Sequence, residues 1–164
     1  MTILFLPQKS ILMAGIRVRV YQFLKLLNNT DINYKVIPGS TKNLDEKIVR
    51  FPSLINKFLW FSYTLLSRFI VLFSVRKYDV VFLQRESLPN VFPLIEILIT
   101  TISKKVVFDF DDAIYTAHRP SGFIRKIFFD SKNIERIIKR SDRTIVSNKY
   151  LAQYAAKFND DIKY

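Results

Sequence analysis

Three aspartates lie within four positions of one another where an apolar segment ends. Asp109, Asp111 and Asp112 follow Val106 to Phe108 in the stretch VVFDFDDAIY. Carboxylates this close repel one another, so they must be solvated, paired with cations or engaged with a ligand. Their chemistry suits attack on phosphate, hydrogen bonding to hydroxyl groups, base catalysis or metal binding. The elements that position them decide which of these applies.

Short apolar segments alternate along the chain with longer helix-like segments, a pattern typical of a parallel sheet with helical crossovers. The predicted strands are Ile3 to Leu6, Tyr34 to Ile37, Val80 to Leu83, Lys105 to Phe108 and Thr144 to Val146, and Ile162 to Tyr164 resembles the opening of another. The predicted helices are Ile16 to Leu27, Ser53 to Val75, Val91 to Ile102, Phe123 to Lys139 and Lys149 to Phe158. We therefore expect an α/β fold, an open doubly wound parallel sheet of Rossmann-like type, in one domain over residues 1–164.

Ligands of such sheets bind outside the carboxyl ends of the strands. The residues that follow the five predicted strands are Gln8 and Lys9, Gly39 and Ser40, Gln84 to Glu86, Asp109 to Asp112, and Ser147 with Asn148. All but the second group can hydrogen-bond or carry charge. Loops are polar in any case, but the acidic cluster favours a binding edge over an ordinary set of loops.

The loop after the first strand carries one glycine, Gly15, and two arginines, Arg17 and Arg19, at the predicted start of the helix. It contains neither the G-x-G-x-x-G dinucleotide fingerprint nor a phosphate-binding P-loop. A lone glycine can let the backbone approach a ligand, and the arginines can meet a phosphate or carboxylate. The alternative is a simple loop glycine with two solvated arginines.

The amino-acid composition limits the classes of partner that we expect the chain to bind. A net charge of +12 attracts polyanions such as nucleic acid, an anionic membrane surface or phosphorylated substrates. No nucleic-acid-reading motif is present, so we expect no nucleic acid partner. The absence of cysteine excludes disulfides and thiolate chemistry and is compatible with the cytoplasm, and the start lacks the pattern of a signal peptide. The single histidine, His118, lies in a turn-like stretch and is expected to be exposed to solvent.

The most hydrophobic segment runs from Ser53 to Val75 and contains one charge, Arg68, after Phe58. A central arginine disfavours a membrane span. The flanking Lys57, Arg76 and Lys77 suit a helix that lies on an anionic bilayer. An ordinary helix packed on a sheet is the other open interpretation.

The D-x-D arrangement of Asp109 and Asp111 resembles the nucleophile loop of haloacid dehalogenase-like phosphatases, and the stretch TIVSN from Thr144 to Asn148 resembles their second motif. Few residues follow Ser147, however, to supply the lysine and second acidic pair that such an enzyme needs. We keep this phosphatase hypothesis as the weaker alternative.

A broader resemblance covers the whole chain. The stretches IRVRVYQF, YDVVFLQRESLP with VFPLIEIL, KKVVFDFDDAIY and RTIVSNKYLAQYAAKFNDDIKY together resemble the N-terminal domain of family 4 glycosyltransferases of the GT-B fold. This resemblance implies a Rossmann-like, acceptor-binding domain that faces a donor-binding domain across a cleft. It also implies hexosyl transfer from a nucleotide-sugar with retention, without an essential metal or other cofactor.

Carried over to this sequence, the resemblance assigns a role near the reacting centre to Asp112, which would orient an acceptor hydroxyl or act as base. The substrate-binding set that it implies is Gly15, Arg17, Arg19, Arg85, Glu86, Asp109, Asp111 and Asn148. Asp109 and Asp111 would bind sugar hydroxyls or pair with Arg85 or Arg119.

The donor domain of that family has no counterpart in these 164 residues. We therefore expect an acceptor-binding half, inactive alone, that is either truncated or completed by a separate polypeptide. The expected acceptor is a sugar or a lipid-linked sugar, bound in the cytoplasm or at the inner face of the cell membrane. A non-catalytic protein that binds the membrane surface is the main alternative from another class.

Overall fold

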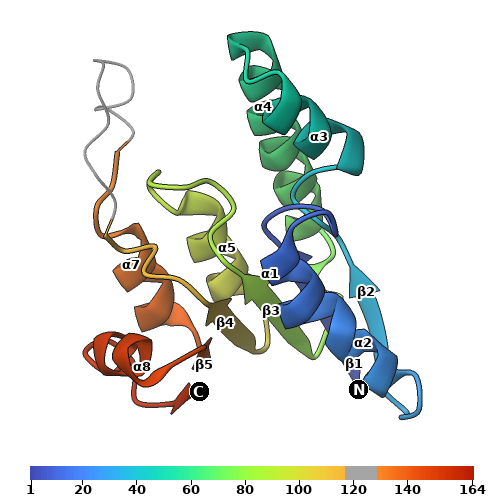
Figure 1. Ribbon diagram of the computed structural model, residues 1–164. Coiled ribbons are helices and arrows are strands. Elements are labelled where there is room, and N and C mark those ends of the chain that lie inside the picture. Colours follow the sequence, from blue (N-terminus) through green and yellow to red (C-terminus); the bar gives the residue numbers. More distant parts are fainter. Residues whose placement is uncertain (117–128) are drawn as a thin grey trace.

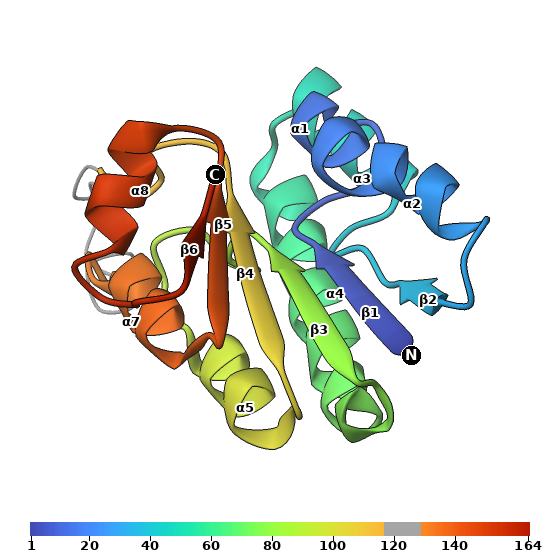
Figure 2. The ribbon, with the colours of Figure 1, turned by 90° about the horizontal axis from the view of Figure 1, so that it is seen from below.

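The computed structural model describes residues 1–116 and 129–164, and they form an α/β fold around one six-stranded parallel sheet. The strand order is β2-β1-β3-β4-β5-β6 (Figures 1 and 2). The strands are β1 Thr2–Pro7, β2 Asn33–Val36, β3 Val80–Gln84, β4 Val106–Phe110, β5 Arg143–Val146 and β6 Ile162–Lys163. The predicted Rossmann-like fold class is confirmed, including the strand that opens at Ile162.

Helices lie on both faces of this sheet (Figure 2). They are α1 Ala14–Ile16, the π-helical turn η1 Arg17–Tyr21, α2 Gln22–Leu27, α3 Lys42–Arg50, α4 Leu54–Leu72, the 3₁₀ turn η2 Val75–Lys77, α5 Leu94–Ile102, α7 Asn133–Arg140 and α8 Lys149–Ala155. Side chains at the N-cap hold the first turns of three of them, because Thr41, Ser53 and Asn148 each accept a backbone N–H three residues on.

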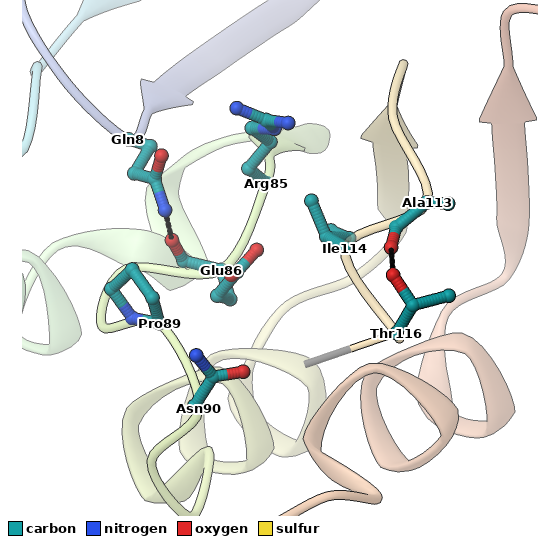
Figure 3. A pocket seen from close by; sticks show the side chains of 8 residues that line it. All are labelled: Gln8, Arg85, Glu86, Pro89, Asn90, Ala113, Ile114 and Thr116. Atoms are coloured by element: carbon teal, nitrogen blue, oxygen red, sulfur yellow. Dashed lines mark hydrogen bonds between the residues drawn. The ribbon is translucent and has the colours of Figure 1, made fainter. Parts of the chain in front are cut away.

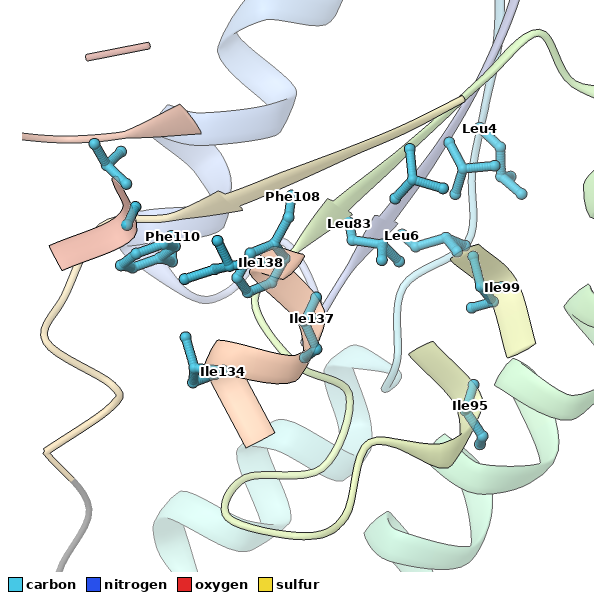
Figure 4. Packing of buried hydrophobic residues seen from close by; sticks show 14 of the residues in the cluster. Leu4, Leu6, Leu83, Ile95, Ile99, Phe108, Phe110, Ile134, Ile137 and Ile138 are labelled. Carbon is cyan, nitrogen blue, oxygen red and sulfur yellow. The ribbon is translucent and has the colours of Figure 1, made fainter. Parts of the chain in front are cut away.

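Alternating strand residues divide the apolar core between the two faces. Leu4 and Leu6 of β1 join a large cluster with residues of β3, β4, α5, α7 and α8, part of which appears in Figure 4. Phe5, which points to the opposite face, joins a smaller cluster with Ile16 and Val20 under the first helical segment. The two-residue period of a strand produces this division, and burial on both faces explains why the central strands β1, β3 and β4 are nearly all apolar.

Several predicted boundaries need correction. The strand expected to end at Phe108 continues to Phe110, so Asp109 belongs to β4 and not to the following loop. Of the helix expected over Phe123 to Lys139, Asn133–Arg140 is α-helical and residues 129–132 are not, while residues 123–128 lie outside the described part of the chain.

Helix α3 was not predicted, because Lys42–Arg50 has few apolar positions. A buried carboxylate anchors it instead: Asp45 accepts hydrogen bonds from the Ser10 backbone N–H at 2.8 Å and from the Ser40 hydroxyl at 2.7 Å.

Helix α4 packs on the sheet through one narrow stripe that includes Thr64, Arg68 and Val71. Arg68 is 1% exposed, and its guanidinium donates to the Ile37 carbonyl at 2.6 Å, to the Pro7 carbonyl and to the Ser87 hydroxyl at 3.3 Å. Burial lowers the pKa of Arg68 to about 10, while nearby Glu96 favours the charged form. The central charge of this apolar helix is therefore buried, and it links α4 to the segments at the carboxyl ends of three strands.

Gly39 belongs to the same junction. A Cβ atom on Gly39 would lie 2.3 Å from the Gln8 carbonyl oxygen and 3.1 Å from Arg68 Nη2. Only glycine fits where two backbone segments and the guanidinium meet this closely. Across residues 1–116 and 129–164, none of the helices has the length and apolar character that crossing a bilayer would require.

We predict that Arg68→Met lowers the free energy of unfolding by about 3 kcal/mol, because two buried carbonyls lose their donor and Glu96 loses a nearby positive charge. Urea denaturation followed by circular dichroism measures this change. The matched control is Arg76→Met, which removes an exposed arginine just after α4 and should change stability by less than about 0.5 kcal/mol. Equal effects of the two substitutions would show that Arg68 does not hold this junction together.

Candidate functional site

The sheet has a topological switch point between β1 and β3. The chain leaves β1 to form β2 on one side and returns to place β3 on the other side. The connections after these two strands therefore diverge to opposite faces of the sheet and leave a crevice at the carboxyl edge. The polar residues that follow β1, β3 and β4 gather at this edge, as their positions in the sequence predict.

Arg19 and Asp109 form a partly buried ion pair between η1 and β4. Arg19 lies in the π-helical turn η1, and such turns are frequent at functional sites. Its Nε donates to Asp109 Oδ2 at 3.1 Å and its Nη2 donates to Oδ1, a two-pronged geometry that suits guanidinium and carboxylate. Burial raises the pKa of Asp109 to about 6, and the hydrogen bonds from Arg19 act in the opposite direction. Both carboxylate oxygens of Asp109 are therefore occupied by hydrogen bonds from Arg19.

Arg85 pairs with the other two carboxylates. Its Nη2 donates to Asp112, and its Nε lies 3.3 Å from Asp111 Oδ1 without the alignment of a hydrogen bond. Arg85 has a φ of 63°, in the left-handed region that non-glycine residues seldom adopt, and its backbone N–H donates to the Asp109 carbonyl at 2.8 Å. Such backbone conformations persist where the surrounding structure holds them, often at binding sites. The strand-end cluster, as we call Arg19, Arg85, Asp109, Asp111 and Asp112, alternates positive and negative groups.

Gly15 lets the first loop approach this cluster closely. A Cβ atom at Gly15 would lie 2.9 Å from Asp111 Oδ2, so a side chain there would displace the carboxylate. A cavity of about 170 Å³ lies between this loop and the cluster, with Lys9, Arg85, Asp111 and Asp112 among its lining residues. The arrangement presents carboxylates, a guanidinium and an ammonium group to one small space.

A larger cavity of about 310 Å³ lies on the other side of Arg85 (Figure 3). Gln8 comes from the end of β1, Glu86 follows β3, and Ile114 and Thr116 follow β4. The Gln8 side chain donates to the Glu86 backbone carbonyl at 2.7 Å and so joins two of the loops. Asn90, with a φ of 61°, also lines the cavity. Polar and apolar walls of this kind suit a ligand that combines hydroxyl groups with an apolar ring face.

Glu86 is the most unusual titratable group here. It is 4% exposed, and its Oε2 has no hydrogen-bond partner within residues 1–116 and 129–164. Burial raises the pKa of Glu86 to about 7; the charge of Arg85 opposes this shift and that of Glu96 adds to it. Around neutral pH, Glu86 therefore exchanges between a neutral acid and a carboxylate.

Arg17 and Asn148, two predicted site residues, have local partners, whereas Ser147 has a partner that is distant in sequence. Arg17 Nη1 donates to the Leu12 carbonyl at 2.7 Å and the Ile11 carbonyl at 3.2 Å, which fixes the first loop. Asn148 caps α8 by accepting the Leu151 N–H at 3.0 Å. Ser147 donates to the Asp111 backbone carbonyl at 2.8 Å and so ties the loop after β5 to the cluster.

His118 and Arg119 lie outside the described residues, so the expected exposure of His118 and a pairing of the carboxylates with Arg119 are not addressed. Within the described ranges, no group of three or more histidine, cysteine, aspartate or glutamate side chains is arranged to hold a metal ion. The three aspartates instead face arginines. Asn90 and Thr116 were not predicted as lining residues, and only the turn-forming character of the Leu-Pro-Asn stretch before α5 pointed toward Asn90.

We predict that Glu86 makes stability depend on pH. Because its pKa in the folded protein, about 7, exceeds its ordinary value of 4.5, its contribution is fully present below pH 4.5 and is lost as the pH rises through 7. Glu86→Gln should therefore match the unsubstituted protein in melting temperature at about pH 5 and exceed it at about pH 8. Thermal melts across this range measure the difference. The exposed Glu46→Gln serves as the control, and parallel pH profiles for all three proteins would contradict the prediction.

No protein-family model matches this chain, and a search of curated proteins finds no match. The resemblance to glycosyltransferases therefore depends on the quoted stretches of sequence. The function of the strand-end cluster has to be inferred from its chemistry.

Proposed function

We propose that the chain is the acceptor-binding half of a retaining glycosyltransferase of the GT-B type. The observation that carries the proposal is the strand-end cluster, in which Arg85, Asp111 and Asp112 line a cavity at the switch point of a parallel sheet and Arg19 pairs with Asp109. Sugars offer many hydroxyl groups, each of which donates to a carboxylate and accepts from a guanidinium. An edge of alternating donors and acceptors is complementary to such a ligand.

Asp112 is the residue that we propose to act on the acceptor hydroxyl. Its side chain is 71% exposed, unlike that of Asp109, and its pairing with Arg85 fixes it at the mouth of the smaller cavity. A carboxylate in this position can orient a hydroxyl and receive its proton as the new glycosidic bond forms, while the bond from the anomeric carbon of the donor sugar to the nucleotide diphosphate breaks and the nucleotide leaves. The donor sugar and its nucleotide would be supplied from the facing domain. The proposed reaction needs no metal at this edge, because each carboxylate of the cluster already lies beside a guanidinium group.

The burial of Asp109 disfavours the phosphatase alternative. A nucleophilic aspartate has to reach phosphorus, but Asp109 has a 2% exposed side chain and both of its oxygens accept hydrogen bonds from Arg19.

The acceptor that we propose is a sugar or a lipid-linked sugar that carries a diphosphate. Three cationic residues that follow β1, namely Lys9, Arg17 and Arg19, are candidates to bind this diphosphate. Arg19 is engaged by Asp109, and Arg17 is engaged by loop carbonyls. Lys9 borders the smaller cavity, and its ammonium lies over the Trp60 ring at 5.7 Å, an interaction that leaves it able to donate hydrogen bonds. Lys9 is therefore the best placed for the phosphate. We propose that the chain acts in the cytoplasm, at the inner face of the membrane, and that it binds no nucleic acid.

We predict the effect of Asp112→Asn on the rate of sugar transfer, measured with this chain and its donor domain combined. Turnover should fall by about 100-fold or more, because the amide cannot accept the hydroxyl proton. The matched control is Asp160→Asn, an exposed carboxylate before β6 that should leave turnover unchanged. A steady-state transfer assay measures both, and unaltered turnover in Asp112→Asn would remove this residue from the mechanism.

A second prediction concerns the chain alone. It should bind no nucleotide-sugar, because the donor contacts belong to the facing domain. Isothermal titration calorimetry with several sugar nucleotides tests this. Micromolar affinity for any of them would contradict the proposal that this chain binds only the acceptor.

A further inference from the structure

Helix α4 carries a broad apolar surface that is largely exposed in the described part of the chain. The side chains of this surface, the α4 outer face, are between 41% and 80% exposed. They are Leu54, Ile55, Phe58, Leu59, Leu65, Leu66, Phe69, Ile70 and Phe73. Exposed patches of this extent on a folded protein mark interaction sites.

The outer face has a regular geometry. At 100° per residue, its members occupy less than half of the helix circumference, opposite the stripe of Thr64, Arg68 and Val71 that contacts the sheet. No charged residue lies within this arc. Figure 1 shows the amino-terminal half of α4 extending beyond the sheet together with α3. Val49 and Phe51, which precede α4 in the sequence, are also exposed.

Exposed basic residues flank the outer face in the sequence. They are Lys47 and Arg50 before α4, Lys57 in its first turn on the side of the sheet-facing stripe, and Arg76 and Lys77 after its end. From Lys47 to Tyr78 the sequence contains no aspartate or glutamate. An apolar surface in a segment whose only charges are basic is complementary to a layer with an apolar interior and an anionic surface.

We propose that the α4 outer face docks on an anionic lipid bilayer, with its aromatic and aliphatic side chains at the acyl boundary and the basic residues against the phosphates. Charge decides this occupant over a second copy of the chain. A second copy would bring its own flanking basic residues and a net charge of +12 to the contact, and the two copies would repel each other. An anionic bilayer would instead neutralise the positive charge of the chain. The helix lies along the surface, since none of the described helices is able to span a bilayer.

Docking through α4 would also position the carboxyl edge of the sheet. Arg68 bonds the helix to the Pro7 carbonyl, and Trp60 lies under the Lys9 ammonium in the loop after β1. The loop after β1, which approaches the strand-end cluster, is thus in direct contact with the helix that we propose to bind the membrane. The proposal itself does not depend on glycosyl transfer, because it concerns a surface separate from the cluster.

Vesicle flotation tests the proposal with phosphatidylglycerol-containing and purely phosphatidylcholine vesicles. The unsubstituted chain should float with the anionic vesicles and much less with the neutral ones. The double variant Phe58→Asp with Phe69→Asp should lose flotation, because it places charge within the apolar arc. Tyr150→Asp, at an 81% exposed aromatic residue of α8, is the matched control and should float like the unsubstituted chain.

The electrostatic part has its own variant. Arg50→Glu with Arg76→Glu should weaken binding to anionic vesicles about tenfold or more, whereas Lys25→Glu on α2 should change it far less. Circular dichroism confirms that each variant is folded. Equal recovery with both kinds of vesicle, or full flotation of the Phe58→Asp, Phe69→Asp variant, would overturn the proposal. So would an absence of vesicle binding accompanied by a concentration-dependent dimer that this variant abolishes, since the face would then join two copies.

Discussion

The guanidinium of Arg68 connects three loops at one edge of the sheet. It reaches the end of β1 through the Pro7 carbonyl, the segment after β2 through the Ile37 carbonyl, and the loop after β3 through Ser87. A fully buried guanidinium is costly unless its donors are satisfied, so the three segments are held in one arrangement about it. Gly39 is required at the same point because any side chain would meet the Gln8 carbonyl. The crevice at the switch point depends on this junction.

Two further arginines, Arg19 and Arg85, also link segments at the carboxyl edge of the sheet. Arg19 bonds η1 to β4 through Asp109, and Arg85 joins the loop after β3 to Asp111 and Asp112. The chain has a large excess of positive charge. The aspartates of the cluster therefore reduce the repulsion among its arginines, and the arginines reduce the repulsion among its aspartates. The acidic stretch after an apolar strand is therefore part of a paired network. Asp112, at its exposed end, keeps the accessibility that a catalytic role requires.

The sequence predicted the architecture well, because strands that are buried on both faces leave nearly continuous apolar segments in the chain. It also predicted which loops meet, since parallel strands bring their carboxyl ends to one edge. It did not predict α3, whose stability comes from the buried Asp45 and not from apolar periodicity. Nor did it predict that Arg68 points inward or that Asp109 is buried, because both depend on partners distant in sequence. Local hydrophobicity alone left open whether α4 packs on the sheet or faces a membrane, and the structure shows one packed face and one exposed face.

The central claim is that the carboxyl edge of this sheet binds the sugar of an acceptor. Two-dimensional amide NMR of the labelled chain, titrated with a neutral oligosaccharide, tests it most directly. The account predicts saturable shifts for residues of the edge, such as Gly15, Arg85 and Asp112, while β6 at the far side of the sheet stays unchanged. Shifts confined to other surfaces, or none at the edge at millimolar sugar, would contradict the account.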